Sequence, residues 1–254
     1  MAGRRIVVGD VHGHYEGLML LMEAITPHSD DKVYFLGDLI DRGPQSASVV
    51  DFIIKQNYQS LLGNHEQLLL EAFPDEEPSP PDMHIWLCSG GQETVTSYSK
   101  DLSQLFEHLK WFRTLPNYLD LGDFWLVHAG VHPGLAVHDQ TAQELCWIRT
   151  EFHSMTEPYF ADKTIIVGHT ITFTLPGVKP GELAQGSGWI DIDTGAYHPK
   201  SGWLTAIDLD NRWVYQVNVY HSGQFRSLPL DEAIAHVKPQ DVLARYRVVS
   251  HNHH

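Results

Sequence analysis

Three short apolar segments in the first third of the chain each run directly into a polar loop that contains glycine. The segments are residues 6–8, 32–36 and 58–62, and the loops after them read GDVHG, GDLIDRG and GNHE. Apolar side chains at helical spacing lie between them, over residues 14–25 and after Pro44, which is expected at the first helical position. Strands alternating with helices predict a parallel sheet, and open α/β sheets place ligands at the carboxyl ends of strands. We therefore expect the three loops to meet at one edge of a sheet.

The rest of the chain predicts a helical segment followed by a β-rich half. Residues 73–82 hold four prolines and four acidic residues and predict an exposed loop, whereas residues 102–112 show an amphipathic helical pattern. Together, residues 73–116 are expected to form a helical insertion near the site. The candidate strands beyond it are residues 117–121, 124–128, 164–168, 189–193, 204–209 and 213–219. Because no repeat or linker is evident, we expect one domain over residues 1–254 with two sheets, helices outside them and a mobile tail at residues 250–254.

The charge and the cysteine content limit the functions that we expect. The chain has 32 acidic and 17 basic residues and a formal charge of −15, so we expect no nucleic-acid partner and no membrane partner. Cys88 and Cys146 form no CxxC pair and cannot make a disulfide framework. The first apolar run is too short for a secretion signal, and no stretch reaches the roughly 18 apolar residues of a membrane span. These features predict a soluble cytoplasmic protein.

Two histidine-containing loops, HAG at 128–130 and GHT at 168–170, follow predicted strands in the second half. With the first three loops they supply carboxylates, imidazoles and one amide: Asp10, His12, Asp38, Asn64, His128 and His169. These ligand types suit Mn²⁺, Fe or Zn²⁺, and the absence of thiolate argues against a structural zinc. Six ligands are too many for one ion but suit two ions with a bridging carboxylate. Any one of these residues could be an N-cap, a turn residue or a satisfied histidine, but six such residues at separate strand ends favour a metal site.

The succession GDxHG, GDxxDRG and GNHE resembles the signature of the metallophosphoesterase (calcineurin-like) superfamily, and more narrowly of its phosphoprotein phosphatase family. The similarity is close over residues 4–72, continues in WLCSGGQETVTSY at 86–98 and thins to HAG, GHT and the IDTG of 192–195. Small bacterial and bacteriophage lambda-type serine/threonine phosphatases are the members that the chain resembles. The resemblance implies an α/β/β/α sandwich and two divalent metal ions, Mn²⁺ before Fe or Zn²⁺. It also implies direct attack of a metal-bridging hydroxide on a phosphomonoester.

The resemblance further implies how the two ions divide the ligands. Asp10, His12 and His169 match the ligands of one ion, Asn64 and His128 those of the other, and Asp38 the bridge.

The same resemblance assigns the residues that act on the substrate. His65 matches a general acid that protonates the leaving alkoxide, and Asp41 matches the carboxylate that orients it. Arg42 matches an arginine that binds the phosphate oxygens, and Arg149 is our candidate for a second. Asp193 suits a turn aspartate equally well and is left out of the predicted site.

The favoured substrate is phosphoserine or phosphothreonine in a protein or peptide, and phosphotyrosine stays open. The first alternative is a symmetrical diadenosine tetraphosphate hydrolase, whose family resembles the chain closely through GDVHG. Those enzymes often lack the aspartate of DRG and carry GNHD, so that Asp41 and Glu66 favour the phosphatase. The second alternative is a non-catalytic interaction module with this fold, against which the complete ligand set argues.

Overall fold

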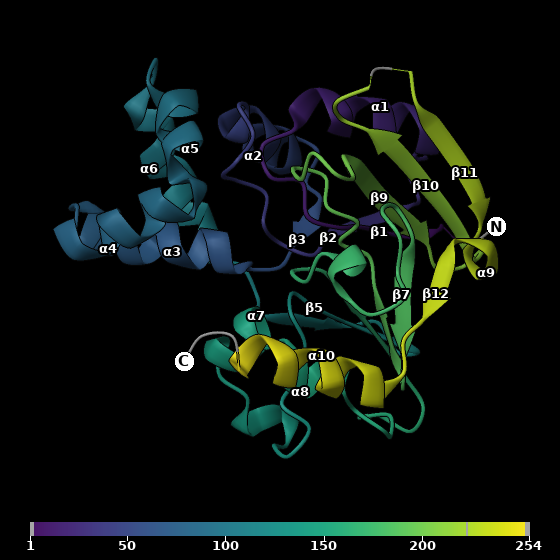
Figure 1. Cartoon of the computed structure of the whole chain (residues 1–254). Helices are drawn as coiled ribbons and strands as arrows, with labels where there is room; N and C mark the ends of the chain where they lie inside the picture. Colours follow the sequence, from purple (N-terminus) through teal and green to yellow (C-terminus); the bar gives the residue numbers. More distant parts are fainter. Residues whose placement is uncertain (1–2, 222, 252–254) are drawn as a thin grey trace.

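The computed structural model describes residues 3–221 and 223–251, and within them the strands form two six-stranded sheets. The first sheet has the order β11-β10-β9-β1-β2-β3 and the second the order β12-β7-β8-β6-β5-β4. In Figure 1 the two sheets lie against each other, with helices on their outer sides. The predicted α/β/β/α sandwich is thus confirmed.

The first sheet combines the expected parallel strands with an antiparallel half. Parallel pairing joins β1 (Arg5–Val8), β2 (Lys32–Phe35) and β3 (Gln59–Ser60). On the other side of β1, antiparallel pairing adds β9 (Trp203–Asp208), β10 (Trp213–Asn218) and β11 (Phe225–Pro229). The chain therefore returns to its first sheet near the end, and β1 lies in its interior.

The second sheet has a parallel centre. It contains β5 (Phe124–Val127), β6 (Thr164–Val167) and β8 (Trp189–Asp191) as parallel neighbours. Antiparallel pairs add β4 (Tyr118–Asp120) to β5 and β7 (Leu183–Gly186) to β8, and β12 (Ile234–His236) pairs in parallel with β7. The carboxyl ends of β5 and β6 consequently lie at the same edge of this sheet.

Strand alternation separates three apolar clusters. On β1, Val7 packs between the sheets with Leu126 of β5 and Ile166 of β6. Ile6 and Val8 point to the opposite face of the first sheet, where they pack under the helices. A third cluster lies outside the second sheet, below α7 (Ala142–Trp147), α8 (Thr150–His153) and α10 (Pro239–His251). Burial on both faces fixes the register of the central strands and therefore the positions of the loops that follow them.

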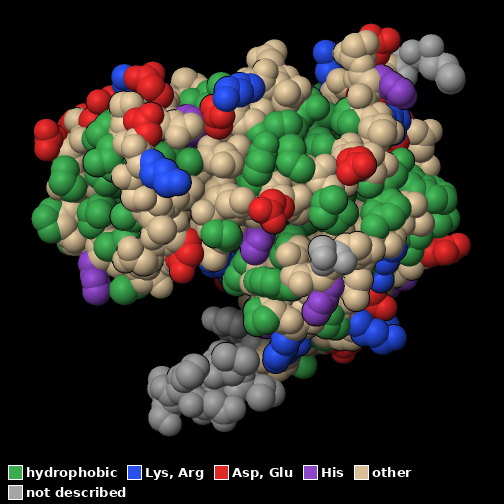
Figure 2. Space-filling view, turned by 90° about the horizontal axis from the view of Figure 1, so that it is seen from above, with side chains coloured by type: hydrophobic (Ala, Val, Ile, Leu, Met, Phe, Trp, Pro, Cys, Tyr) green, Lys and Arg blue, Asp and Glu red, His purple; other side chains and the backbone are tan. Residues whose placement is uncertain are grey.

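The helices of the first half cover the first sheet and extend beyond it. The covering helices are α1 (Tyr15–Ile25) and α2 (Ser46–Lys55), and α3 (Asn64–Ala72) begins directly after β3. A helical lobe projects from the body in Figures 1 and 2 and contains α3, α4 (Pro80–Trp86), α5 (Gln92–Tyr98) and α6 (Leu102–Phe112). A π-helical segment, η2 (Leu87–Gly91), connects α4 with α5. Shorter elements are the 3-10 turns η1 (Pro74–Glu76), η3 (Val137–Asp139) and η4 (Thr172–Thr174) and the helix α9 (Leu230–Ala233).

Several predicted boundaries were wrong. Residues 73–82 are largely exposed but are not a plain loop, because Pro80 and Pro81 occupy the first turn of α4, where proline fits a helix. Pro44 is not a helical residue, since Gln45 caps α2 and its N–H binds Gly13. β3 is shorter than residues 58–62 because the N–H of Leu62 bonds to Pro116 instead of β2. The short strands β7, β11 and β12 were missed.

The end of the chain was expected to form a mobile tail at residues 250–254, and α10 continues through His251. The mobility of this segment stays a prediction. Residues 252–254 lie outside the described part of the chain.

The surface agrees with the mixed composition of the sequence. On the face shown in Figure 2, acidic and basic side chains are interspersed and form no continuous basic patch among the residues described. In the described part of the chain, none of the helices combines the length and the apolar character needed to span a bilayer.

Candidate active site

The predicted metal ligands come together from the ends of five strands. Asp10 and His12 follow β1, Asp38 follows β2, Asn64 begins α3 after β3, and His128 and His169 follow β5 and β6. None of the six residues is more than 6% exposed. The edges of both sheets thus place carboxylate, amide and imidazole groups in one buried cluster, as the carboxyl-end rule for α/β sheets predicts.

The carboxylate of Asp38 lies at the centre of this cluster. Its Oδ1 is 3.3 Å from Nε2 of His128, and its Oδ2 is 3.6 Å from Nε2 of His12. Two groups of potential metal ligands share this residue, one with His12 and His65 and the other with His128 and His169. A carboxylate whose two oxygens face different imidazoles has the geometry of a bridge between two cations.

His169 groups differently from the prediction. Its Nδ1 is 2.7 Å from Oδ1 of Asn64, which is also 3.0 Å from Nε2 of His128. Parallel pairing of β5 and β6 brings the two histidines together, and their ring centroids are 5.1 Å apart. The imidazole of His169 thus lies beside Asn64 and His128, which favours the ion of these two residues over the predicted ion of Asp10 and His12.

The side chain of Asp10 contacts the backbone of the loop that carries His169. Its carboxylate accepts the N–H of His169 at 3.1 and 3.3 Å. A Cβ atom at Gly168 would lie 2.1 Å from Oδ1 of Asp10, so this position requires glycine. The GHT motif thus binds to the GDVHG loop although 159 residues separate them.

The protonation and orientation of the histidines suit metal ligation. Burial lowers the pKa of His12, His128 and His169 below the usual value, which favours neutral imidazole. Nδ1 of His12 lies 2.9 Å from the carbonyl of Ile40, and Nδ1 of His128 lies 2.8 Å from that of Leu36. If Nδ1 carries the proton in each ring, the Nε2 lone pair faces the centre of the cluster, as in protein metal sites. Nε2 of His169 is buried and has no hydrogen-bond partner among the described residues, as expected of an atom that is free to bind a metal ion. The carboxylate, amide and neutral imidazole groups of the cluster therefore fit divalent cations.

The loops that carry these side chains have unusual backbone conformations. Positive φ angles between 47° and 70° occur at five predicted site residues: His12, Asp38, Asp41, Arg42 and His169. Each non-glycine residue in this region costs about 1–3 kcal/mol, and such strain concentrates at functional sites. Strain at five positions here supports the view that the loops serve a function other than stability.

A histidine–aspartate pair lies beside the metal-ligand cluster. Nδ1 of His65 is 2.7 Å from Oδ2 of Asp41, and neither residue is more than 1% exposed. Nε2 of His65 lies on the other side of the ring, 4.0 Å from Asp38. The pair is therefore arranged so that Asp41 binds one nitrogen while the other faces the cluster.

Both predicted arginines line a pocket above the cluster, together with His65, Asn64 and Tyr197. This pocket has a volume of about 200 Å³. The Arg42 guanidinium lies 4.0 Å from the centre of the Tyr197 ring, and Nη1 of Arg149 donates to the carbonyl of His169 and the hydroxyl of Thr170. Two fixed guanidinium groups above buried carboxylates suit a tetrahedral anion such as phosphate.

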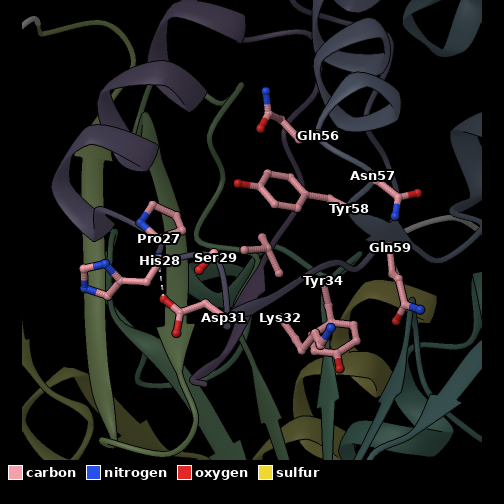
Figure 3. A pocket seen from close by; sticks show the side chains of 11 residues that line it. Pro27, His28, Ser29, Asp31, Lys32, Tyr34, Gln56, Asn57, Tyr58 and Gln59 are labelled. Atoms are coloured by element: carbon pink, nitrogen blue, oxygen red, sulfur yellow. Dashed lines mark hydrogen bonds between the residues drawn. The ribbon is translucent and has the colours of Figure 1, made fainter. Parts of the chain in front are cut away.

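A larger pocket, of about 410 Å³, lies away from this cluster (Figure 3). It contains Asp31, Lys32 and Gln59 at the amino ends of β2 and β3, and His28 donates its N–H to Asp31 there. None of the predicted site residues lines it. The opposite ends of the same strands carry the cluster, so the smaller pocket is the candidate active site.

Sequence reasoning missed or set aside three residues of this region. Tyr197 supplies the ring beneath Arg42, and no motif indicated it. Asp193 accepts the N–H of Gly195, as a turn aspartate does, but it is also buried near the cluster, and burial raises its pKa to about 6. Glu66 binds four backbone N–H groups, which the GNHE motif alone did not reveal. The IDTG motif was therefore the available signal for Asp193, and the GNHE motif was the signal for Glu66.

Comparison with known proteins points to one family. A family model described as calcineurin-like phosphoesterase matches residues 3–191. Serine/threonine-protein phosphatase 2 of Escherichia coli is 31% identical over 210 residues, which cover 78% of this chain and 89% of that protein. The symmetrical bis(5'-nucleosyl)-tetraphosphatase of Actinobacillus succinogenes is 33% identical over 137 residues, which cover 50% of this chain and 44% of that protein. A solved structure proposed to be a diadenosine tetraphosphatase shares the fold, with a TM-score of 0.61, 22% identity and coverage of 90% of this chain and 94% of that one.

Proposed function

Because the chain belongs to the calcineurin-like phosphoesterase family, we propose that it is a metal-dependent phosphomonoesterase that acts on phosphoserine and phosphothreonine in proteins. The observation that carries this proposal is the His65–Asp41 pair at 2.7 Å, which adjoins a pocket lined by two arginines. This arrangement offers an acid for a leaving oxygen and guanidinium groups for the phosphate in the same space.

The cluster around Asp38 is the proposed site of two divalent ions, with Mn²⁺ preferred and Fe or Zn²⁺ as alternatives. Asn64, His128 and His169 lie together and are assigned to one ion, with Asp38 as the bridge. Asp10 and His12 are assigned to the other ion, as the resemblance implies. When bound, such ions neutralise the phosphate dianion and lower the pKa of water.

The arginines act on the phosphate group. Arg42 and Arg149 donate to its non-bridging oxygens and stabilise the charge that these oxygens carry as the ester bond breaks. The Tyr197 ring lies against Arg42 and limits the positions of its guanidinium. Arg149 is held in place by Thr170 and by the carbonyl of His169.

His65 acts on the leaving group. As the oxygen of water forms its bond to phosphorus, the bond from phosphorus to the ester oxygen breaks, and Nε2 of His65 transfers a proton to that oxygen. The attacking water releases one proton to solvent, and solvent returns one to His65. Asp41 binds Nδ1–H and holds the ring in the orientation that this transfer needs. A serine or threonine alkoxide is a strong base and needs the proton more than a departing nucleotide phosphate does. The intact pair therefore supports an alkyl phosphomonoester as the substrate.

A symmetrical dinucleoside tetraphosphatase is the second candidate function. A second pocket, of about 190 Å³, shares Arg149 and Thr174 with the first and includes Arg245 of α10. A substrate with several phosphates could extend from the first pocket toward this additional cation. The similarity to curated tetraphosphatases, which spans about half of this chain, favours the same candidate.

A parallel assay distinguishes the two candidates. With Mn²⁺ present, we expect kcat/KM for phosphothreonine and phosphoserine peptides to exceed that for diadenosine tetraphosphate, and turnover to stop in chelator. The reverse order would establish the tetraphosphatase. Full metal loading without turnover of either substrate or of p-nitrophenyl phosphate would instead support the non-catalytic interaction module.

A further inference from the structure

Helices α4 and α5 of the helical lobe contact Asp41 of the His65–Asp41 pair through two buried side chains. Nε1 of Trp86, at the end of α4, donates to both carboxylate oxygens of Asp41 at 3.1 and 3.0 Å. Oγ1 of Thr94, on α5, donates to Oδ1 of Asp41 at 2.6 Å. Trp86 and Thr94 are both fully buried. Asp41 is thus bound by two neutral donors in addition to His65.

Thr94 also holds the backbone of Asp41. Its hydroxyl oxygen accepts the N–H of Asp41 at 2.9 Å, and the hydroxyl of Ser46 lies 2.9 Å away. Ser46 accepts the same N–H at 3.1 Å. One threonine therefore fixes both the position of the Asp41 backbone and the plane of its carboxylate.

The π-helical segment between Trp86 and Thr94 completes the contact. The N–H of Arg42 donates to the carbonyl of Gly90 at 2.9 Å, and a Cβ atom at Gly90 would lie 2.7 Å from Cγ of Arg42. At Gly91 a Cβ atom would lie 2.5 Å from the Trp86 ring. Both glycines are needed for this close approach, and π-helical segments are frequent at functional sites.

The conformation of Asp41 and Arg42 explains why such support is needed. Their φ angles are 70° and 68°, so two consecutive non-glycine residues are left-handed. Because the left-handed region is unfavourable for residues that carry a side chain, the conformation persists only where surrounding contacts enforce it. The lobe supplies these contacts from Trp86, Gly90 and Thr94.

We propose that Trp86 and Thr94 are positioning residues for general-acid catalysis: they hold Asp41 so that His65 is aligned with the leaving oxygen. Among the described residues, His65 is the only group that forms an ion pair with Asp41. The two neutral donors orient the carboxylate without placing another cation beside it. This inference rests on the proposed function, since it concerns the proton that His65 delivers.

The test compares two aryl phosphates that differ in their leaving group. p-Nitrophenolate leaves readily without a proton, whereas phenolate from phenyl phosphate is more basic and gains more from an acid. In the Thr94→Val variant, we expect kcat/KM for phenyl phosphate to fall about tenfold or more, and that for p-nitrophenyl phosphate to fall less than about threefold. Thr94→Ser keeps the hydroxyl and should restore most of the difference.

Trp86→Phe supplies an independent comparison, because it removes the indole donor but keeps an aromatic ring beside Gly91. We expect the same selective loss with phenyl phosphate, and circular dichroism of each variant reports whether it is folded. Equal losses with both substrates in folded Thr94→Val, or no loss with either, would overturn the positioning role while leaving the phosphatase intact. If the wild-type protein hydrolysed neither ester with Mn²⁺, the proposed function itself would fail, and this inference with it.

Discussion

The carboxylate of Glu66 accepts the backbone N–H of Asp38 at 2.8 Å, across 28 positions of sequence. The same carboxylate accepts the N–H groups of Gly63, Leu39 and Ile40. Glu66 is fully buried at the start of α3. The last residue of GNHE thus holds the loop of GDLIDRG, which carries the proposed bridging ligand.

Replacement of Glu66 by alanine should therefore destabilise the protein. Four buried N–H groups would lose their acceptor, and a buried donor without a partner costs about 1–3 kcal/mol. Because water and local relaxation can satisfy some of these groups, we expect the free energy of unfolding to fall by about 3 kcal/mol. Urea unfolding of the metal-free protein measures this, with Glu71→Ala on the exposed side of the same helix as control. If both variants unfolded at the same urea concentration, the role assigned to Glu66 would be wrong.

The grouping of His169 with His128 predicts how many metal ions each histidine variant can still bind. If the two residues bind the same ion, His128→Ala, His169→Ala and the double variant should each retain about one high-affinity Mn²⁺ site. His12→Ala combined with His169→Ala should retain none, because each change affects a different ion. Calorimetric titration with Mn²⁺ measures the stoichiometry. Retention of one tight site in the His12/His169 double variant would show that His169 binds the same ion as Asp10 and His12.

The sequence predicted the part of the site that lies in short motifs at strand ends. Asp38, Asn64 and His169 line one pocket with His65 and the two arginines, because strand order brings their loops to one edge. His12 and His128 lie beside Asp38 in the same cluster. The contact of His169 with His128 could not be predicted, since it depends on the pairing of β5 with β6. Tyr197 and Trp86 belong to segments whose contacts with Arg42 and Asp41 arise only from tertiary packing. Short strands such as β12 have too few residues to show a period of two.

His65→Asn should lower turnover while both ions stay bound. Loss of a general acid typically reduces the rate about 10²–10⁴-fold, and the reduction should be largest for substrates with a basic leaving group. Asparagine is uncharged and close in shape, so the neighbouring ligands should keep their positions. Steady-state kinetics and metal analysis of the same sample make the comparison, with exposed His138→Asn as control. Wild-type rates in His65→Asn would exclude the general-acid assignment.

The stability of the metal-free protein should fall between pH 6.5 and 4, in part because of His108. This residue lies on α6 with Nδ1 2.7 Å from the Tyr98 hydroxyl, and burial lowers its pKa to about 4. In that pH range the unfolded chain binds a proton at His108 and the native state does not. Stability therefore rises with pH up to the unfolded value of about 6.5 and is lost as pH falls toward 4. The slope of stability against pH measures how many more protons the unfolded state binds than the native state. His108→Gln should reduce this number by up to about one, whereas His84→Gln, on the exposed surface of the same lobe, should leave it unchanged. Urea unfolding at pH 4.5, 5.5 and 6.5 measures the slope, and identical slopes in wild type and His108→Gln would show that His108 has no part in it.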